Sequence, residues 1–546
     1  MHNAHVVESS RQALVLAYGT AALCHLLNAS VSTVEARFAE LEVPLSAEAE
    51  TALASLQELE NALPPGVTNE DIAPDLARFK ILSMYVEGAE TTCADMIRLS
   101  AGAPRQSFDG DDDLERTLVE LAWHVYPLLL IVDARPGRHH GLLVNWTSPV
   151  RHRFEAELYN DPDLRQLFSE EERHGDHIGY AYSSAGAGGT MQTCGFADRI
   201  LSSAWKLAHF RSSAPVPDDF LSAARELLRT LRSAIRGEHA TVPVRVGLAG
   251  VLPPEGMNTV DWKWGRIRPV DDRDMRFSRR TPFGGENDNL HYTDADGNNV
   301  QIRYSGDIVV EVDLPYRVQG AKTPDEVNRT ANPFSDWTSI EETMDNIRLA
   351  LLLTGQAQNT TVVATWNTLV DPLFHPDNMG WQDPRLGAGL LPTQLDHQQI
   401  DEWGVWAARI ADTRTQEVGV AVRRLLRAVA ERQQDEDSLV DAIIVWENLF
   451  GAAQETTLRV TTAIAWLLGA SPDERIELQK KYKKIYAQRS QIVHGSDKIK
   501  NNLTAQYAKD AIQISIDLLR VIFRDRPDLL SIRDASDRSI AVVLQK

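Results

Sequence analysis

Residues 471–495 read SPDERIELQKKYKKIYAQRSQIVHG and are the most informative stretch of the chain. Ser471 and Glu474 form a capping box around a proline that suits the first helical position. Gly495 suits the left-handed conformation that ends many helices. The stretch therefore predicts one long helix with both ends specified, and His494 is expected in its last turn.

This predicted helix has an apolar stripe and a strongly basic surface. The stripe is expected to be buried, and it consists of Ile476, Tyr482, Ile485, Tyr486 and Val493. Between residues 480 and 500, seven basic residues stand against the single acid Asp497, which gives this segment a net charge of +6. The basic residues are Lys480, Lys481, Lys483, Lys484, Arg489, Lys498 and Lys500.

The rest of the chain is acidic. The 546 residues include 56 Lys and Arg against 77 Asp and Glu, so the net charge is −21 and the part outside the basic segment carries −27. Affinity for nucleic acid phosphates comes from Lys and Arg. The balance therefore argues against a protein that coats duplex DNA, but it permits one local basic site.

An arginine and a histidine in a basic segment suit phosphodiester chemistry. Histidine exchanges protons near neutral pH, and arginine can hold a phosphate and offset developing negative charge. At a helix C-terminus, the dipole would favour the cationic form of His494. The alternative is a Lys-rich amphipathic helix in which the histidine only donates to free carbonyls at the helix end.

The segment from Arg489 to His494 fits the Arg-x4-His signature of HEPN domains, with Ser490 as the polar residue that usually follows the arginine. Its surroundings resemble the Apea-like HEPN group over about residues 405–530. The resemblance rests on WENLFG (446–451), ETTLR (455–459), AWLLG (465–469) and YAQRS (486–490), and residues 350–381 are similar to the segment that often precedes this domain.

The resemblance implies a bundle of antiparallel helices that dimerises, so that two Arg-x4-His motifs face one site. Many such domains are metal-independent endoribonucleases of toxin, antiphage or stress systems, without a cofactor. By this resemblance Arg489 would contact the scissile phosphate and His494 would donate or accept a proton, while the RNA 2′-hydroxyl attacks and leaves a cyclic phosphate. Glu447 and Glu455 would orient Arg489 or the helix pair, although a structural or solvated ion pair would explain them equally well.

The expected partners follow from the same resemblance. RNA would contact six lysines of the basic segment, namely Lys480, Lys481, Lys483, Lys484, Lys498 and Lys500. The chain would form a homodimer or higher homo-oligomer through the HEPN domain, and a regulatory protein or phage trigger would control it. The alternative is a non-catalytic HEPN module for RNA binding or dimerisation. The presence of both Arg489 and His494 favours the enzyme, since a degenerate domain is free to lose either.

Hydrophobic periodicity predicts a mostly α protein with a central β-rich segment, an α+β multidomain chain. Residues 1–240 are expected to form a mostly helical region that senses or regulates. Residues 241–325 are β-rich, with a hairpin around 296–298, and 326–404 are a mixed connecting region. The HEPN-type helical domain would occupy 405–546.

The sequence also argues against a disulfide framework, a structural zinc site and a membrane protein. Three widely separated cysteines form no CxxC pair. The apolar stretch 121–132 is shorter than the roughly twenty residues that a membrane span needs, and it predicts buried core. Because the first residues have no basic segment leading into an apolar one, we expect a cytoplasmic protein.

Four further segments give weak signals. The pair His174 and His177 is better explained by surface histidines than by a metal site. The glycine-rich segment 183–189 is expected to be a flexible connection, and 294–298 a turn rather than a calcium loop. The segment 262–273 contains two tryptophans among arginines, which fits either base stacking on a basic strand or a half-buried strand.

Overall fold

The computed structural model of this chain is mostly helical, with a small antiparallel sheet. It describes residues 13–39, 44–63, 73–133, 144–145, 147–174, 177–184, 187–262, 265–278, 289–293, 299–303, 306–321, 335–354, 362–373, 379–381, 393–413, 416–432, 434–493 and 501–544. None of the helices formed by these residues is both long and apolar enough to cross a membrane.

The chain forms two compact units, and each is assembled from segments that are distant in the sequence. Unit 1 comprises Met1–Pro243, Leu314–Asp336 and Leu369–Asn378. Unit 2 comprises Val244–Asp313, Trp337–Thr368 and Met379–Lys546. The sequence predicts four consecutive regions, 1–240, 241–325, 326–404 and 405–546. The two units do not test these boundaries, which therefore stay a prediction.

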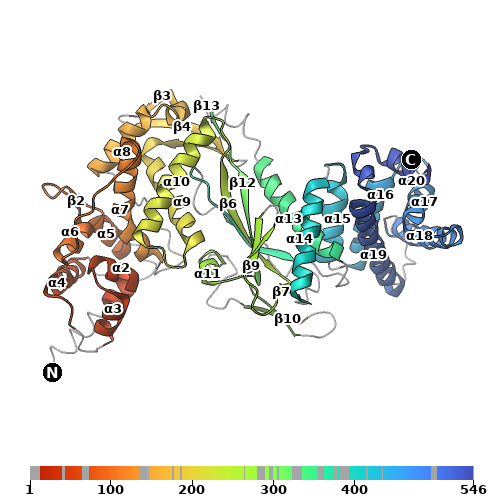
Figure 1. Ribbon diagram of the computed structural model, residues 1–546, viewed down its shortest axis with the longest axis horizontal. Coiled ribbons are helices and arrows are strands. Elements are labelled where there is room, and N and C mark those ends of the chain that lie inside the picture. Colours follow the sequence, from red (N-terminus) through yellow and green to blue (C-terminus); the bar gives the residue numbers. More distant parts are fainter. Residues whose placement is uncertain are drawn as a thin grey trace. The chain divides into compact units, whose positions relative to one another are not determined.

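Unit 1 is a helical assembly built around the apolar helix α7 (Figure 1). The stretch 121–132, expected to be buried core, lies within α7, and Leu121, Val125 and Ile131 are at most 2% exposed. Its helices include α2 (Thr20–Leu26), α3 (Val31–Phe38), α4 (Ala47–Ala62), α5 (Ala73–Leu82), α6 (Cys93–Ser100), α7 (Asp113–Asp133), α8 (Pro149–Asn160), α9 (Phe196–Arg211) and α10 (Pro217–Ile235).

A small antiparallel sheet of unit 1 corrects the prediction for residues 183–189. These residues were expected to form a flexible connection, but all of them except 185 and 186, which lie outside the described residues, are strand residues. The strands are β3 (Phe168–His174), β4 (His177–Ser184), β5 (Ala187–Gln192) and β13 (Val318–Ala321), and β4 pairs with the other three. Small residues give no apolar alternation, so pairing with neighbouring strands decides this structure without a local signal.

Unit 2 contains the central sheet, in the order β15-β14-β6-β12-β9-β8. The fully buried Trp366 on β14 packs against Gly247 on β6, where an added Cβ would lie 2.1 Å from the indole nitrogen. The strands are β6 (Thr241–Ala249), β8 (Val260–Trp262), β9 (Gly265–Pro269), β12 (Ile308–Pro315), β14 (Val363–Leu369) and β15 (Met379–Trp381). Strands β6, β12 and β14 each begin or end with residues of unit 1.

Two short strand pairs complete unit 2. The antiparallel strands β10 (Asn289–Thr293) and β11 (Asn299–Arg303) confirm the hairpin expected around 296–298, although the turn itself lies outside the described residues. Strand β7 (Val251–Leu252) pairs in parallel with β16 (Thr393–Gln394).

Five of the C-terminal helices of unit 2 pack around α16, and in Figure 1 they run from cyan to dark blue. Short loops join α15 to α16 and α17 to α18, so the members of each pair run antiparallel. Helix α16 contacts five neighbours, namely α15, α17, α18, α19 and α20. The helices are α13 (Ser335–Thr354), α14 (His397–Thr413), α15 (Gly419–Ala430), α16 (Asp435–Phe450), α17 (Thr456–Leu468), α18 (Pro472–Val493), α19 (Asn501–Asp525) and α20 (Ala535–Leu544).

Helix α18 matches the prediction at its start and departs from it along its buried face. The backbone N–H of Glu474 donates to the Ser471 hydroxyl at 3.2 Å, which is one half of the predicted capping box. The other half differs, because the Glu474 carboxylate accepts from the backbone N–H of Ala470 at 2.8 Å instead of that of Ser471. The stripe residues Tyr482, Ile485 and Tyr486 are buried, as expected. Two others are not.

Ile476 is 54% exposed and Val493 53% exposed, so the predicted stripe was wrong at both ends. Ile476 lies six residues before Tyr482, which turns its side chain about 120° away from the buried face. Val493 is on that face but is the last residue of the described helix, and His494 lies outside the described residues.

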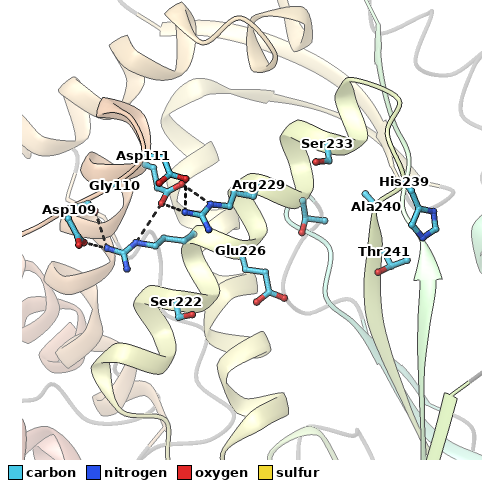
Figure 2. A pocket seen from close by; sticks show the side chains of 13 residues that line it. Asp109, Gly110, Asp111, Ser222, Glu226, Arg229, Ser233, His239, Ala240 and Thr241 are labelled. Carbon is cyan, nitrogen blue, oxygen red and sulfur yellow. Dashed lines mark hydrogen bonds and ion pairs between the residues drawn. The ribbon is translucent and has the colours of Figure 1, made fainter. Parts of the chain in front are cut away.

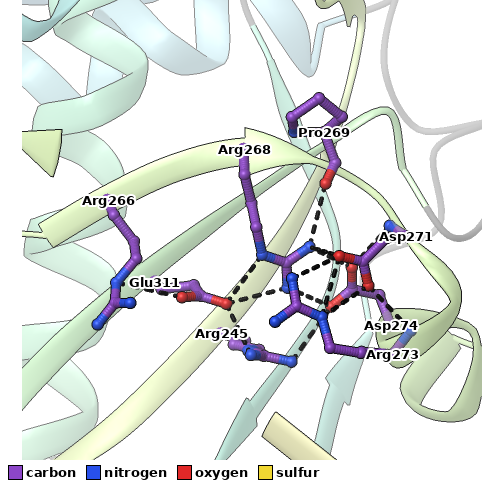
Figure 3. A network of polar contacts seen from close by, with 8 residues as sticks. All are labelled: Arg245, Arg266, Arg268, Pro269, Asp271, Arg273, Asp274 and Glu311. Atoms are coloured by element: carbon purple, nitrogen blue, oxygen red, sulfur yellow. Dashed lines mark hydrogen bonds and ion pairs between the residues drawn. The ribbon is translucent and has the colours of Figure 1, made fainter. Parts of the chain in front are cut away.

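The arginines around strand β9 are satisfied by carboxylates (Figure 3). Arg268, 3% exposed, donates to the fully buried Asp274 at 2.6 and 2.8 Å and pairs with Glu311 at 2.9 Å. Trp262 packs edge-on against Trp403, with ring centroids 5.4 Å apart. These contacts support the half-buried strand and not the base-stacking alternative. Trp264 lies outside the described residues.

Candidate functional site

Arg489 and Glu447 lie side by side on two helices of unit 2. Arg489 belongs to the last third of α18, and Glu447 to the last turn of α16, 42 residues earlier in the chain. Nη2 of Arg489 lies 3.4 Å from Oε2 of Glu447, and the two side chains are 24% and 26% exposed. The structure thus brings together two of the residues selected from the sequence, in a position that solvent reaches.

Tyr486 completes this group, and sequence reasoning missed its role. Its hydroxyl donates to Oε1 of Glu447 at 2.5 Å, so each carboxylate oxygen of Glu447 meets one residue of α18. Burial raises the pKa of Tyr486, and the hydrogen bond and charge of Glu447 raise it further, so the phenol stays protonated. The three-residue spacing of Tyr486 and Arg489, neighbours on a helix surface, was the available signal.

One nitrogen of Arg489 has no partner in the described part of the chain. Its Nε is buried and no described residue accepts a hydrogen bond from it. A buried donor without an acceptor costs about 1–3 kcal/mol. An anion that approached Arg489 would offer acceptors to this guanidinium, whose orientation Glu447 already constrains.

The described lysines of α18 divide into paired and unpaired groups. Lys480 pairs with Glu477 at 2.8 Å, and Lys481 pairs with Asp510 of α19 at 3.1 Å. Lys483 and Lys484 make no ion pair with any described residue. Acids outside 480–500 thus offset part of the basic charge counted from the sequence. Lys498 and Lys500 fall outside the described residues, as His494 does.

Glu455 and Ser490, the other two supporting residues selected from the sequence, do not share the contacts of this group. Ser490 is the partly exposed neighbour of Arg489 on α18. Glu455 precedes α17, is exposed, and lines a separate pocket of about 460 Å³ together with residues of α17 and α18. Of the two glutamates selected from the sequence, Glu447 contacts Arg489, whereas Glu455 makes no ion pair with any described residue.

Several residues that carry the sequence resemblance hold the bundle together. The indole nitrogen of Trp446, a fully buried residue, donates to the Ser515 hydroxyl of α19 at 3.0 Å. The guanidinium of Arg475 stacks over the Trp466 ring at 4.2 Å. Such contacts position α16, α17 and α18, and with them Glu447 and Arg489.

A larger pocket of about 800 Å³ lies in unit 1 along α10 (Figure 2). Arg229 of α10 pairs with Asp111 at 2.8 Å and with the buried Glu115 at 2.8 Å, and Arg225 pairs with Asp109. The acidic run 109–113 is therefore fixed to α10 by arginines. Because these charges satisfy one another, we ascribe a structural role to the cluster.

His174 ends strand β3 and His177 begins strand β4. Their backbones are register partners in the antiparallel pair of β3 and β4. Within the described ranges, no group of three or more His, Cys, Asp or Glu side chains is placed to hold a metal ion.

In unit 2, Glu447 thus orients the Arg489 guanidinium, and the protonated Tyr486 holds the Glu447 carboxylate in place. Helix α18 also carries two ammonium groups without an ion pair among the described residues, those of Lys483 and Lys484. These groups can bind a phosphate and stabilise negative charge on it. Comparison of the chain with protein-family models, with curated proteins and with solved structures finds no match.

Proposed function

We propose that this chain is a metal-independent endoribonuclease whose active site lies on α16 and α18 in a HEPN-type helical domain. The observation that carries the proposal is the Arg489 guanidinium, held at 3.4 Å by Glu447, whose other oxygen accepts from Tyr486. The unpaired Lys483 and Lys484 on the same helix add positive charge. His494, five residues after Arg489, supplies the proton-transfer group by resemblance to the Arg-x4-His motif.

In the proposed reaction, the RNA 2′-oxygen forms a bond to the adjacent phosphorus while the bond from phosphorus to the 5′-oxygen breaks. The 2′-hydroxyl loses its proton and the departing 5′-oxygen gains one, so the products are a 2′,3′-cyclic phosphate and a 5′-hydroxyl. Arg489 stabilises the charge on the phosphoryl oxygens. His494 acts at one of the two proton transfers, and Glu447 and Tyr486 position Arg489.

RNA is the proposed substrate because DNA lacks the 2′-hydroxyl that attacks. By the same resemblance, we place the enzyme in a toxin or antiphage system, as a homodimer or higher oligomer that a regulatory protein or phage component triggers. Unit 1 contains the residues that we assign to sensing.

Incubation of the full-length chain with total RNA in the presence of EDTA tests the proposal. Wild type is expected to cleave, and His494→Ala to lose cleavage. Lys509→Ala, which replaces an exposed lysine of α19 outside the group of Arg489, Glu447 and Tyr486, serves as the control and is expected to cleave like wild type. Undiminished cleavage by His494→Ala would remove this residue from the mechanism. RNA binding without cleavage by wild type would instead establish the non-catalytic module.

A further inference from the structure

A second pocket lies close to the proposed site and is lined by side chains of mixed chemistry. It has a volume of about 460 Å³ and lies between the start of α17 and the middle of α18. Its lining contains a carboxylate, an amide, an ammonium group, two threonines and one large apolar side chain. These residues are Glu455, Thr456, Thr457, Leu458, Gln479 and Lys483.

The carboxylate of Glu455 is held here by an unfavourable backbone conformation. Glu455 has φ 54° and ψ 30°, in the left-handed region that favours glycine and asparagine. Strained residues of this kind cluster at functional sites. The side chain is exposed and makes no ion pair with any described residue. A free acceptor therefore stands at the pocket, at a backbone position that would be less strained as glycine.

The other polar groups leave the pocket rich in acceptors. The amide nitrogen of Gln479 donates to the Thr461 hydroxyl at 3.2 Å, which leaves its Oε1 as an acceptor and its second N–H as a donor for a ligand. The Thr456 hydroxyl donates to the Ala452 carbonyl, so its oxygen can still accept. The carboxylate of Glu455 adds two further acceptor oxygens to the lining.

Leu458 and Lys483 provide an apolar wall and a free charge. Leu458 is 56% exposed and lines the pocket, so it offers an apolar surface there. Lys483 is exposed and, as noted above, unpaired among the described residues. An apolar surface, a carboxylate and an ammonium group suit a flat, partly aromatic ligand with N–H donors on one edge and a phosphate attached.

We propose that this pocket binds a guanine base of a single-stranded nucleic acid, with Glu455 accepting from guanine N1–H and the N2 amino group. Guanine is the base with two adjacent donors on its Watson–Crick edge, and this edge is the one that proteins read in single strands. The base lies against Leu458, and Lys483 contacts a flanking phosphate. This proposal rests on the proposed function, because it takes the bound strand to be the RNA whose phosphate Arg489 contacts.

Binding of short single-stranded DNA separates this proposal from cleavage, because DNA lacks the 2′-hydroxyl. Fluorescence anisotropy would compare two thymidine pentamers, one with a central guanine and one with hypoxanthine, which lacks only the N2 amino group. The full-length wild type is expected to prefer guanine about tenfold, the discrimination typical of one bidentate contact. Glu455→Gln is expected to bind both strands alike, whereas the control Asp435→Asn, at the far end of α16, keeps the preference.

Lys483→Ala provides an independent readout. It is expected to weaken the binding of both strands equally. It should also reduce the slope of log affinity against log salt by about 0.7, because one phosphate contact of a single strand contributes about this much. Lys509→Ala is expected to leave this slope unchanged.

Equal binding of the two strands by wild type, or a preference that persists in Glu455→Gln, would overturn the proposal. Guanosine monophosphate that binds as tightly as the pentamer would also overturn it, since the pocket would then serve a free nucleotide. Guanine preference without any RNA cleavage would refute the proposed function while supporting this site. RNA cleavage without guanine preference would support the proposed function and refute this site.

Discussion

Protonation of His124 is expected to destabilise unit 1 as the pH falls. This residue of α7 is 6% exposed and lies edge-on to the rings of Tyr85 and Phe108. Its Nδ1 is buried without a hydrogen-bond partner in the described part of the chain. Burial lowers the pKa of His124 to about 4, with the charge of Asp95 opposing this shift and that of Arg153 adding to it.

The size of the effect follows from proton linkage. The unfolded chain has a histidine pKa of about 6.5 and therefore binds more protons than the folded state between pH 6.5 and 4. The stability due to neutral His124 is complete above this range and is lost as the pH falls through it. At pH 5 the loss is about 2 kcal/mol, because each pH unit below 6.5 costs about 1.4 kcal/mol.

Hydrogen exchange of the α7 amides, corrected for intrinsic rates, measures this loss locally. Between pH 7 and 5, the opening free energy of wild type is expected to fall by about 2 kcal/mol more than that of His124→Leu. The pH dependence of the opening free energy that remains in His124→Leu is assigned to His25, because burial also lowers the pKa of this residue. His239→Leu, which replaces an exposed histidine, should behave as wild type. Equal pH dependence in wild type and His124→Leu would refute the reasoning.

Three further predictions concern unit 2. Tyr486→Phe removes the hydrogen-bond donor to Glu447 and should slow RNA cleavage about tenfold. This is less than the hundredfold or more expected for loss of a direct phosphate contact. An unchanged rate would mean that Tyr486 does not position the site. Asp274→Asn replaces the fully buried carboxylate beside Arg268 by a neutral amide while Glu311 remains, so denaturant unfolding should show a loss of about 1.5–3 kcal/mol. Trp446→Phe removes a buried hydrogen bond and should cost about 1–2 kcal/mol in the same assay; a loss near zero would contradict either assignment.

The sequence predicted features that depend on local chemistry. The capping box at Ser471 and the turn chemistry at 296–298 act within a few residues, and the corresponding helix start and hairpin are present. The buried segment of α7 was likewise readable, because continuous apolar residues of that length must be covered by other parts of the chain.

Features that depend on distant segments could not be predicted. Glu447 and Arg489 are 42 residues apart, and their contact exists because α16 packs against α18. The pairing of Lys481 with Asp510 also joins two helices, so a charge count along 480–500 overstated the free positive charge. Strands β3 and β5 lack apolar alternation, although Ile178, Tyr180 and Tyr182 alternate along β4, and the sheet depends on pairing among these strands.

The central claim is that Arg489, positioned by Glu447, acts on a phosphate that the neighbouring 2′-hydroxyl attacks. The most direct test compares cleavage of one RNA and its fully 2′-O-methylated counterpart by wild type and Arg489→Ala, in EDTA. We predict that wild type cuts only the unmodified RNA and leaves 2′,3′-cyclic phosphate ends, and that Arg489→Ala is slower by about 10²–10³. Cleavage of the methylated strand, or an Arg489→Ala rate equal to that of wild type, would contradict the account.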